Sequence, residues 1–108
     1  MSTADLALLQ RWVHSRDAEA FAEIVARYSG MVYATCRRIL RNPEDAEDVT
    51  QECFLRLARG QTDVHSSLAG WLHYLATHRS LDLVRSQSSR KKREATHAAT
   101  QTDGGDIG

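Results

Sequence analysis

The chain has 108 residues, of which 42% are hydrophobic and 26% charged, so it fits one small domain and excludes a second domain of ordinary size. Its formal net charge is zero, which argues neither for nor against a nucleic-acid partner. No apolar run approaches the ~18 residues of a membrane span, and the amino terminus lacks the layout of a secretory signal. We therefore expect a cytoplasmic protein with no membrane partner.

Apolar spacing predicts a first helix that ends at about residue 14. Leu6, Leu9 and Val13 recur at helical intervals, with Trp12 beside them. The first helix is thus expected to pack inward through these three residues.

A second helix is predicted after Asp17, because an aspartate can accept hydrogen bonds from the free N–H groups of a first helical turn. Its apolar stripe alternates steps of three and four residues. The members of this stripe are Phe21, Ile24, Val25, Tyr28, Val32, Cys36 and Ile39.

The sequence NPED at 42–45 predicts the start of a third helix. Asn42 can cap it, Pro43 suits the first helical position, and acids in the first turn oppose the helix dipole. The helix is expected to run to about Arg59, with Gly60 as a left-handed end. Its expected inner residues are Ala46, Val49, Cys53 and Leu57, flanked by Phe54.

Residues 60–67 are polar and turn-prone, which predicts a loop, and Ser66 or Ser67 can cap a fourth helix. The inward residues of that helix are expected to be Leu68, Leu72, Leu75, Ala76 and Leu83. Residues 96–108 are small, polar and glycine-rich, which predicts a flexible tail or linker after a domain over residues 1–95. No strand-like alternation is present, so we expect an all-α fold, a compact three- to four-helix bundle with a disordered C-terminal tail.

Neither catalysis nor a metal site is indicated. His73 and His78 are five residues apart, on different faces of a helix, and the other three histidines are scattered. No zinc-protease, phosphate-loop or nucleophile-elbow motif occurs. Cys36 and Cys53 lie in apolar stripes without paired-cysteine spacing, so they are expected to be buried, reduced thiols without a cofactor.

Charge is distributed unevenly despite the neutral total. Residues 44–52 contain five acids and no base, whereas residues 79–93 contain six bases and one acid. This separation predicts two different partners or one internal pairing of the two segments.

The polar side of the third helix has two interpretations. Its residues are Glu47, Asp48, Gln51, Glu52, Leu55 and Arg56. Periodicity alone favours a solvated surface with a pair between Glu52 and Arg56 at i, i+4. The alternative is a docking surface for a partner helix, in which Leu55 is the apolar anchor.

Several stretches resemble region 2 of extracytoplasmic-function (ECF) sigma factors. DAEAFAEIVARY at 17–28, VYA at 32–34, RIL at 38–40 and NPEDAEDVTQECFLRL at 42–57 are similar to regions 2.1 and 2.2. GWLHYLA at 70–76 follows, and RSLDLVR at 79–85 resembles region 2.4. The most specific element is the D-x-x-Q-E-x-F pattern at 48–54. The resemblance implies a non-enzymatic domain of a bacterial transcription-initiation factor.

In that family, the region 2.2 surface docks on the clamp helices of the polymerase β′ subunit. The resemblance therefore implies that core RNA polymerase is a partner, and it favours the docking interpretation of the third helix. The implied polymerase-binding residues are Asp48, Gln51, Glu52 and Leu55. An anti-sigma factor is a further candidate partner.

The basic segment fits a DNA partner, because aromatic rings beside cations can stack on bases and contact phosphates. A solvated tail at Arg90 to Arg93 and a core position for Trp71 are the plain alternatives. By resemblance, the loop near 63–67 and the start of the fourth helix hold a flipped base of the promoter −10 element from the non-template single strand, without a chemical step. The full predicted DNA-binding set is His65, Ser66, Ser67, Trp71, Tyr74, His78, Arg79, Arg85, Arg90, Lys91, Lys92 and Arg93.

Three departures from the family pattern are visible. His78 stands where an asparagine is common, and His73-Tyr74 stands where Tyr-Arg is common, so the preferred base can differ. No region 4, the reader of the −35 element, follows.

A duplex-reading helix-turn-helix protein is disfavoured by the eight-residue loop at 60–67. A bundle that binds polymerase or an anti-sigma factor without engaging DNA stays open.

Overall fold

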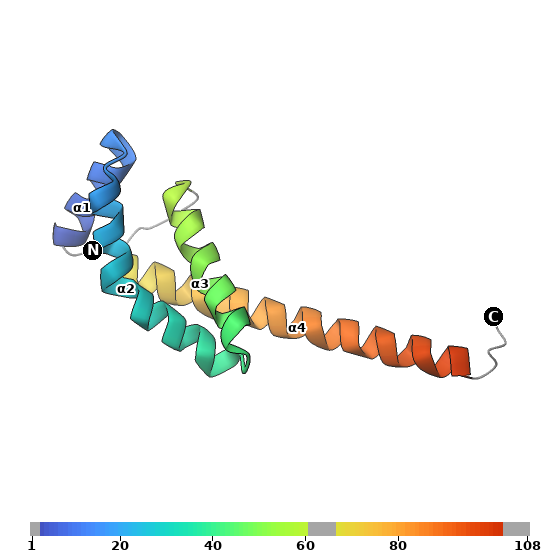
Figure 1. Cartoon of the computed structure of the whole chain (residues 1–108). Helices are drawn as coiled ribbons and strands as arrows, with labels where there is room; N and C mark the ends of the chain where they lie inside the picture. The colour runs from blue at the N-terminus through green and yellow to red at the C-terminus, as the bar shows by residue number, and fades with distance from the viewer. Residues whose placement is uncertain (1–2, 61–66, 103–108) are drawn as a thin grey trace.

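The computed structural model describes residues 3–60 and 67–102, with side chains over 4–60 and 67–95. Four helices follow one another: α1 (Thr3–Ser15), α2 (Ala18–Ile39), α3 (Pro43–Ala58) and α4 (Leu68–Thr102). Figure 1 shows α1, α2 and α3 grouped around the first turns of α4, while the rest of α4 projects away. The described segments contain no strand, and the predicted all-α bundle is confirmed.

Side-chain caps define where the helices begin. Oδ1 of Asp17 accepts hydrogen bonds from the backbone N–H groups of Glu19 and Ala20 at 3.1 and 3.3 Å. Oδ1 of Asn42 accepts from the first turn of α3 in the same way, at 2.8 and 3.4 Å. Ser67 begins α4, since its Oγ accepts from the N–H of Gly70 at 2.8 Å. The predicted caps of α2 and α3 are thus confirmed.

The end of α3 also follows the prediction. Gly60 has a φ of +74°, in the left-handed region that glycine adopts without steric cost. Arg16, between α1 and α2, has a φ of 52° although it is not a glycine. Both residues turn the chain out of the helix that precedes them.

The core forms between α2, α3 and α4. The inner residues predicted for α3 are all buried, as are the first four predicted for α4, and Leu83 packs partly buried against them. In α2 the centre of the stripe is buried at Ile24, Val32 and Cys36, while Phe21 and Val25 are only half-buried at its edge. Helical periodicity therefore predicted the inner sides of these three helices correctly.

The orientation predicted for α1 is only partly correct, because Leu9 packs partly buried against the core while the other two predicted residues do not. Leu6 and Val13 are exposed at 43% and 52%, whereas Leu8 is buried at 7% and the Asp5 carboxylate lies inside at 4%. The stripe that contains Leu6 and Val13 and the stripe that contains Asp5 and Leu8 both follow helical spacing. Periodicity therefore could not show which of the two faces the core. The choice depends on polar contacts that α1 makes with other helices.

Two polar contacts of α1 decide its orientation. The hydroxyl of Tyr28 on α2 donates to the Asp5 carboxylate, which raises the pKa of Tyr28, and Arg27 lies 3.4 Å from the other carboxylate oxygen. At the other end of α1, Nε1 of Trp12 donates to the Ala58 carbonyl at the end of α3, at 3.0 Å. Rotating α1 toward the predicted stripe would break both contacts.

Helix α4 continues beyond the bundle. Its apolar pattern ends at Val84, yet its backbone is helical to Thr102. Figure 1 shows no other helix beside this outer part. A helix that packs against no other element is only marginally stable in water. The division into a domain over 1–95 and a flexible tail over 96–108 stays a prediction. Residues 103–108 lie outside the described part.

Both cysteines are buried free thiols, as predicted. Burial raises the pKa of the Cys53 thiol to about 12, and the nearby Cys36 thiol and Glu52 carboxylate act in the same direction. A thiol with so high a pKa is a poor nucleophile. Among the described helices, none is long and apolar enough to span a membrane.

Candidate functional site

The polar side of α3 is exposed in part and half-buried in part. Asp48 and Gln51 are exposed, and Leu55 is 50% exposed. Glu52 is half-buried and pairs with Arg56 at 3.2 Å, as the i, i+4 spacing predicts. The structure therefore places all four predicted polymerase-binding residues on one accessible side of the bundle.

An apolar groove of about 360 Å³ runs between α2 and α3. Its lining residues are Phe21, Val25, Ser29, Thr50, Gln51, Phe54, Leu55 and Ala58. Gln51 and Leu55 thus stand on one edge of a groove whose other wall comes from α2. The apolar stripe of α2 predicts core positions for Phe21 and Val25, and helical spacing alone does not indicate that they also line a groove.

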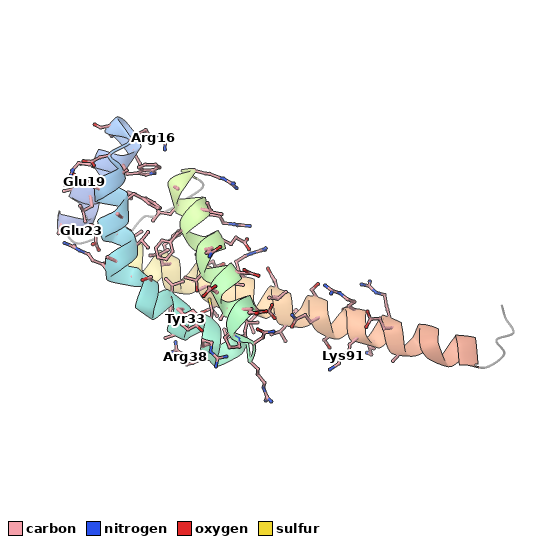
Figure 2. All side chains as sticks on the ribbon, in the orientation of Figure 1. Arg16, Glu19, Glu23, Tyr33, Arg38 and Lys91 are labelled. Atoms are coloured by element: carbon pink, nitrogen blue, oxygen red, sulfur yellow. The ribbon has the colours of Figure 1, made fainter. Side chains whose placement is uncertain are left out.

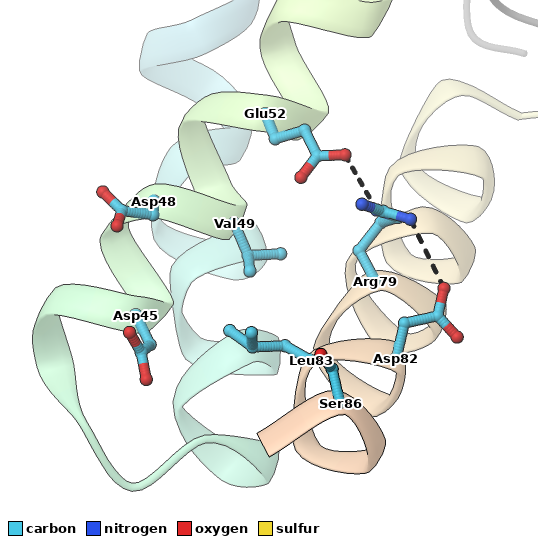
Figure 3. Close-up of a pocket in the computed structure, with 8 residues that line it drawn as sticks. All are labelled: Asp45, Asp48, Val49, Glu52, Arg79, Asp82, Leu83 and Ser86. Atoms are coloured by element: carbon cyan, nitrogen blue, oxygen red, sulfur yellow. Dashed lines mark hydrogen bonds and ion pairs between the residues drawn. The ribbon is translucent and has the colours of Figure 1, made fainter. Parts of the chain in front are cut away.

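A second groove, of about 380 Å³, lies between α3 and α4. Figure 3 shows its carboxylates on α3, with Arg79 and Asp82 facing them from α4 and Val49 and Leu83 between the helices. Its lining residues are Asp45, Asp48, Val49, Glu52, Arg79, Asp82, Leu83 and Ser86. The side of α3 therefore divides into an apolar edge toward α2 and an acidic edge toward α4.

One ion pair crosses the second groove, and two others lie within α4 at its edge. Nε of Arg79 lies 2.8 Å from Oε2 of Glu52, and its Nη1 lies 3.4 Å from Oδ2 of Asp82. Arg85 pairs with the other oxygen of Asp82 at 3.2 Å. Further along, the Gln87 amide donates to Asp45 at 2.9 Å. The acidic and basic segments are thus partly paired with each other, one of the two outcomes that the charge pattern predicted.

The aromatic residues predicted to contact DNA differ in accessibility. Tyr74 is 62% exposed, and its ring lies 4.1 Å from the ring of exposed His78, at an interplanar angle of 37°. Trp71 is half-buried and packs against the core. Ser67 caps α4, while His65 and Ser66 lie outside the described residues.

The remaining predicted DNA contacts lie on the outer part of α4. These residues are all exposed: Arg85, Arg90, Lys91, Lys92 and Arg93. Figure 2 shows Lys91 on the projecting helix, well away from α1. Most of the positive charge of α4 therefore lies further along the helix than the acidic groove.

The described residues show no group of three or more histidine, cysteine, aspartate or glutamate side chains that could hold a metal ion. The carboxylates of the second groove instead face Arg79, and both cysteines are buried. The arrangement is that of binding surfaces on a helical scaffold.

Comparison with known families agrees with the fold and with this arrangement of surfaces. The family model "Sigma-70 region 2" matches residues 24–90, from the middle of α2 into the outer part of α4. The chain belongs to the sigma-70 region 2 family and is a sigma factor domain.

Two curated relatives illustrate the similarity, and both are named as ECF RNA polymerase sigma factors. The ECF RNA polymerase sigma factor SigK of Mycobacterium sp. (strain KMS) is 38% identical over 104 residues, which cover 94% of this chain and 54% of that protein. The factor SigW of Bacillus subtilis (strain 168) is 33% identical over 91 residues, or 82% of this chain and 49% of that protein. The chain spans about half the length of the curated relatives it matches. No solved structure gives a match.

Proposed function

We propose that this domain binds core RNA polymerase through α3 and engages the single-stranded −10 element of promoter DNA through α4. Family membership and the names of its relatives support a role in transcription initiation. The observation that carries the polymerase contact is the exposed Leu55 beside an apolar groove, on the helix that bears the D-x-x-Q-E-x-F sequence.

The groove between α2 and α3 fits an apolar side chain from a partner helix. Leu55 is half exposed at its edge, and Phe21 and Val25 form the facing wall. Covering the exposed half of a leucine side chain contributes roughly 1 kcal/mol. Gln51 and Asp48, one and two turns away from Leu55, would fix the register of the partner through polar contacts. The clamp helices of the β′ subunit are the proposed partner.

Four predicted DNA residues share one side of α4, because Ser67, Trp71, Tyr74 and His78 follow steps of four, three and four residues. The exposed rings of Tyr74 and His78, which lie next to each other in a tilted arrangement, offer a platform for an unpaired base. The cations further along the helix contact phosphates of any sequence. Capture of an extruded base would favour strand opening without any chemical step, so the domain acts as a non-enzymatic factor in the cytoplasm.

One observation favours a second candidate function. Arg79 and Arg85, both predicted DNA contacts, pair with carboxylates of this chain. A domain whose cations are occupied in this way could bind polymerase or an anti-sigma factor without engaging DNA. The two candidate functions differ in whether the domain, free or bound to polymerase, binds single-stranded −10 DNA.

The test is a pull-down of purified bacterial core RNA polymerase with the tagged chain, followed by titration with a labelled non-template strand. The proposal requires retention of polymerase and binding of the strand by the complex. If the chain retains polymerase but the complex does not bind the strand, the second candidate function, an interaction module that does not engage DNA, would be supported. A folded chain that retains no polymerase would contradict both candidates.

A further inference from the structure

Arg79 connects the two proposed binding surfaces. It belongs to α4, which carries the DNA surface, and contacts Glu52 on α3, which carries the polymerase surface (Figure 3). The side chains of Arg79 and Glu52 are each 35% exposed, so a partner can reach both from the open side of the groove.

The surroundings of Arg79 disfavour a phosphate. Four carboxylates line this groove, and Arg79 is the one cation among its described lining residues: Asp45, Asp48, Glu52, Arg79, Asp82. A phosphate that approached Arg79 would meet these negative charges at short range and would have to displace Glu52. In the free chain, Arg79 is therefore poorly placed to contact DNA.

The contact between Arg79 and Glu52 is nevertheless easy to break. The buried Nε–H of Arg79 is not aligned for a hydrogen bond with any group in the described part of the chain, although Nε lies 2.8 Å from the Glu52 carboxylate. Ion pairs with this much exposure contribute little to stability. Glu52 also pairs with Arg56 and Asp82 with Arg85, so neither carboxylate is left without a cation when Arg79 moves.

We infer that the Glu52–Arg79 ion pair couples the two surfaces. In the free chain Glu52 holds Arg79 away from DNA, and a cation of the docked polymerase that takes Glu52 releases Arg79 for a phosphate of the promoter strand. This inference rests on the proposed function, which supplies both the polymerase cation and the phosphate. Because linkage is reciprocal, the bound strand then strengthens polymerase binding by the same factor.

The experiment measures the affinity of the free chain for a fluorescein-labelled single-stranded oligonucleotide by anisotropy. The proteins are the natural chain, Glu52→Gln, Arg79→Gln and the double variant. Glu52→Gln should bind roughly two- to fivefold tighter, which is the range for an exposed ion pair. Arg79→Gln alone should bind no tighter than the natural chain, and the double variant should bind no tighter than Arg79→Gln, so that the gain from Glu52→Gln is lost. Arg79→Lys combined with Glu52→Gln should keep most of it, because the cation is retained.

The matched control is Glu47→Gln, which removes the same charge from an exposed position of α3 outside the groove. The gain in oligonucleotide affinity from Glu47→Gln should be smaller than that from Glu52→Gln, and it should persist when Arg79 is replaced. Equal gains from Glu52→Gln with and without Arg79, or no gain at all, would overturn the coupling.

Failure of the coupling can be told apart from failure of the proposed function. If the natural chain binds polymerase and the strand but the substitutions act additively, the coupling alone is overturned. If neither the natural chain nor its polymerase complex binds the strand, the DNA role and the coupling fall together.

Discussion

Leu55 is the exposed apolar side chain on which the proposed polymerase contact depends. It is 50% exposed on an otherwise polar side of α3, at the edge of an apolar groove. Leu6 is a matched position, because it is a leucine of 43% exposure on α1, and it is not a lining residue of that groove.

We expect Leu55→Ala to weaken polymerase binding by about 1 kcal/mol, or roughly fivefold in Kd, because the apolar area it would bury is lost. Leu6→Ala should leave the Kd unchanged. Both variants should melt close to the natural chain, since neither residue is in the core. Surface-immobilised polymerase and circular dichroism provide the two measurements. Equal losses in both variants would argue against a contact at α3.

Cys53 makes stability depend on alkaline pH. Its pKa is about 12 in the folded chain against an ordinary 9.0, chiefly because the thiol is buried. Above pH 9 the unfolded chain loses this proton while the folded chain keeps it, so the contribution is complete below pH 9 and is lost as pH rises toward 12.

The free energy of unfolding should therefore fall more steeply with pH in the natural chain than in Cys53→Ala, by up to ~1.4 kcal/mol per pH unit above pH 9. Urea titrations at pH 8, 9 and 10 measure this slope. Other groups that titrate, including Tyr28, are common to both proteins and cancel in the comparison. Parallel slopes would show that the thiol is not protected as its burial indicates.

At the scale of the elements, α1 is attached to α2 by a buried polar contact. The Tyr28 hydroxyl donates to the Asp5 carboxylate, which is 4% exposed. Hydrogen bonds to a buried charge contribute more to stability than neutral ones.

Tyr28→Phe should lower the free energy of unfolding by about 2 kcal/mol, because it removes a hydrogen bond to a buried carboxylate. Tyr33→Phe is the control, since Tyr33 is a half-buried tyrosine of the same helix whose hydroxyl forms no hydrogen bond within the described residues. Urea denaturation compares the two. A similar small loss in both variants would mean that the contact with Asp5 contributes little.

At the scale of the whole molecule, positive charge and the acidic groove are separated along α4. The bundle contains the groove between α3 and α4, and the projecting part of α4 carries the exposed cations at 90–93. A strand that stacks on Tyr74 and follows α4 outward would pass these cations one after another.

Replacing all four residues from Arg90 to Arg93 by glutamine should lower the salt dependence of single-strand binding by up to ~3 in the slope of log K against log salt. His78→Ala should instead change the preference among bases at one position and leave the slope alone. Titrations with varied oligonucleotides at several salt concentrations separate the two effects. Tighter binding to duplex, or identical behaviour of the two variants, would contradict base capture on α4.

Most of the scaffold could be predicted from the sequence, because the interactions that define it are local. A cap such as Asp17 or Asn42 acts within three residues, and a stripe repeats every three or four, so the helix starts and the inner sides of α2, α3 and α4 follow from short segments. The same periodicity brought four candidate polymerase contacts to one side of α3. It could not choose between two equally spaced stripes on α1.

Tertiary structure decided what depends on contacts between distant residues. Asp5 and Tyr28 are 23 residues apart and together set the rotation of α1. The wall that Phe21 and Val25 offer to Leu55 exists only once α2 and α3 are packed, and Arg79 meets Glu52 only because α4 crosses α3. Sequence spacing carries no information about such pairs, since the angle and register at which two helices pack depend on all the side chains between them.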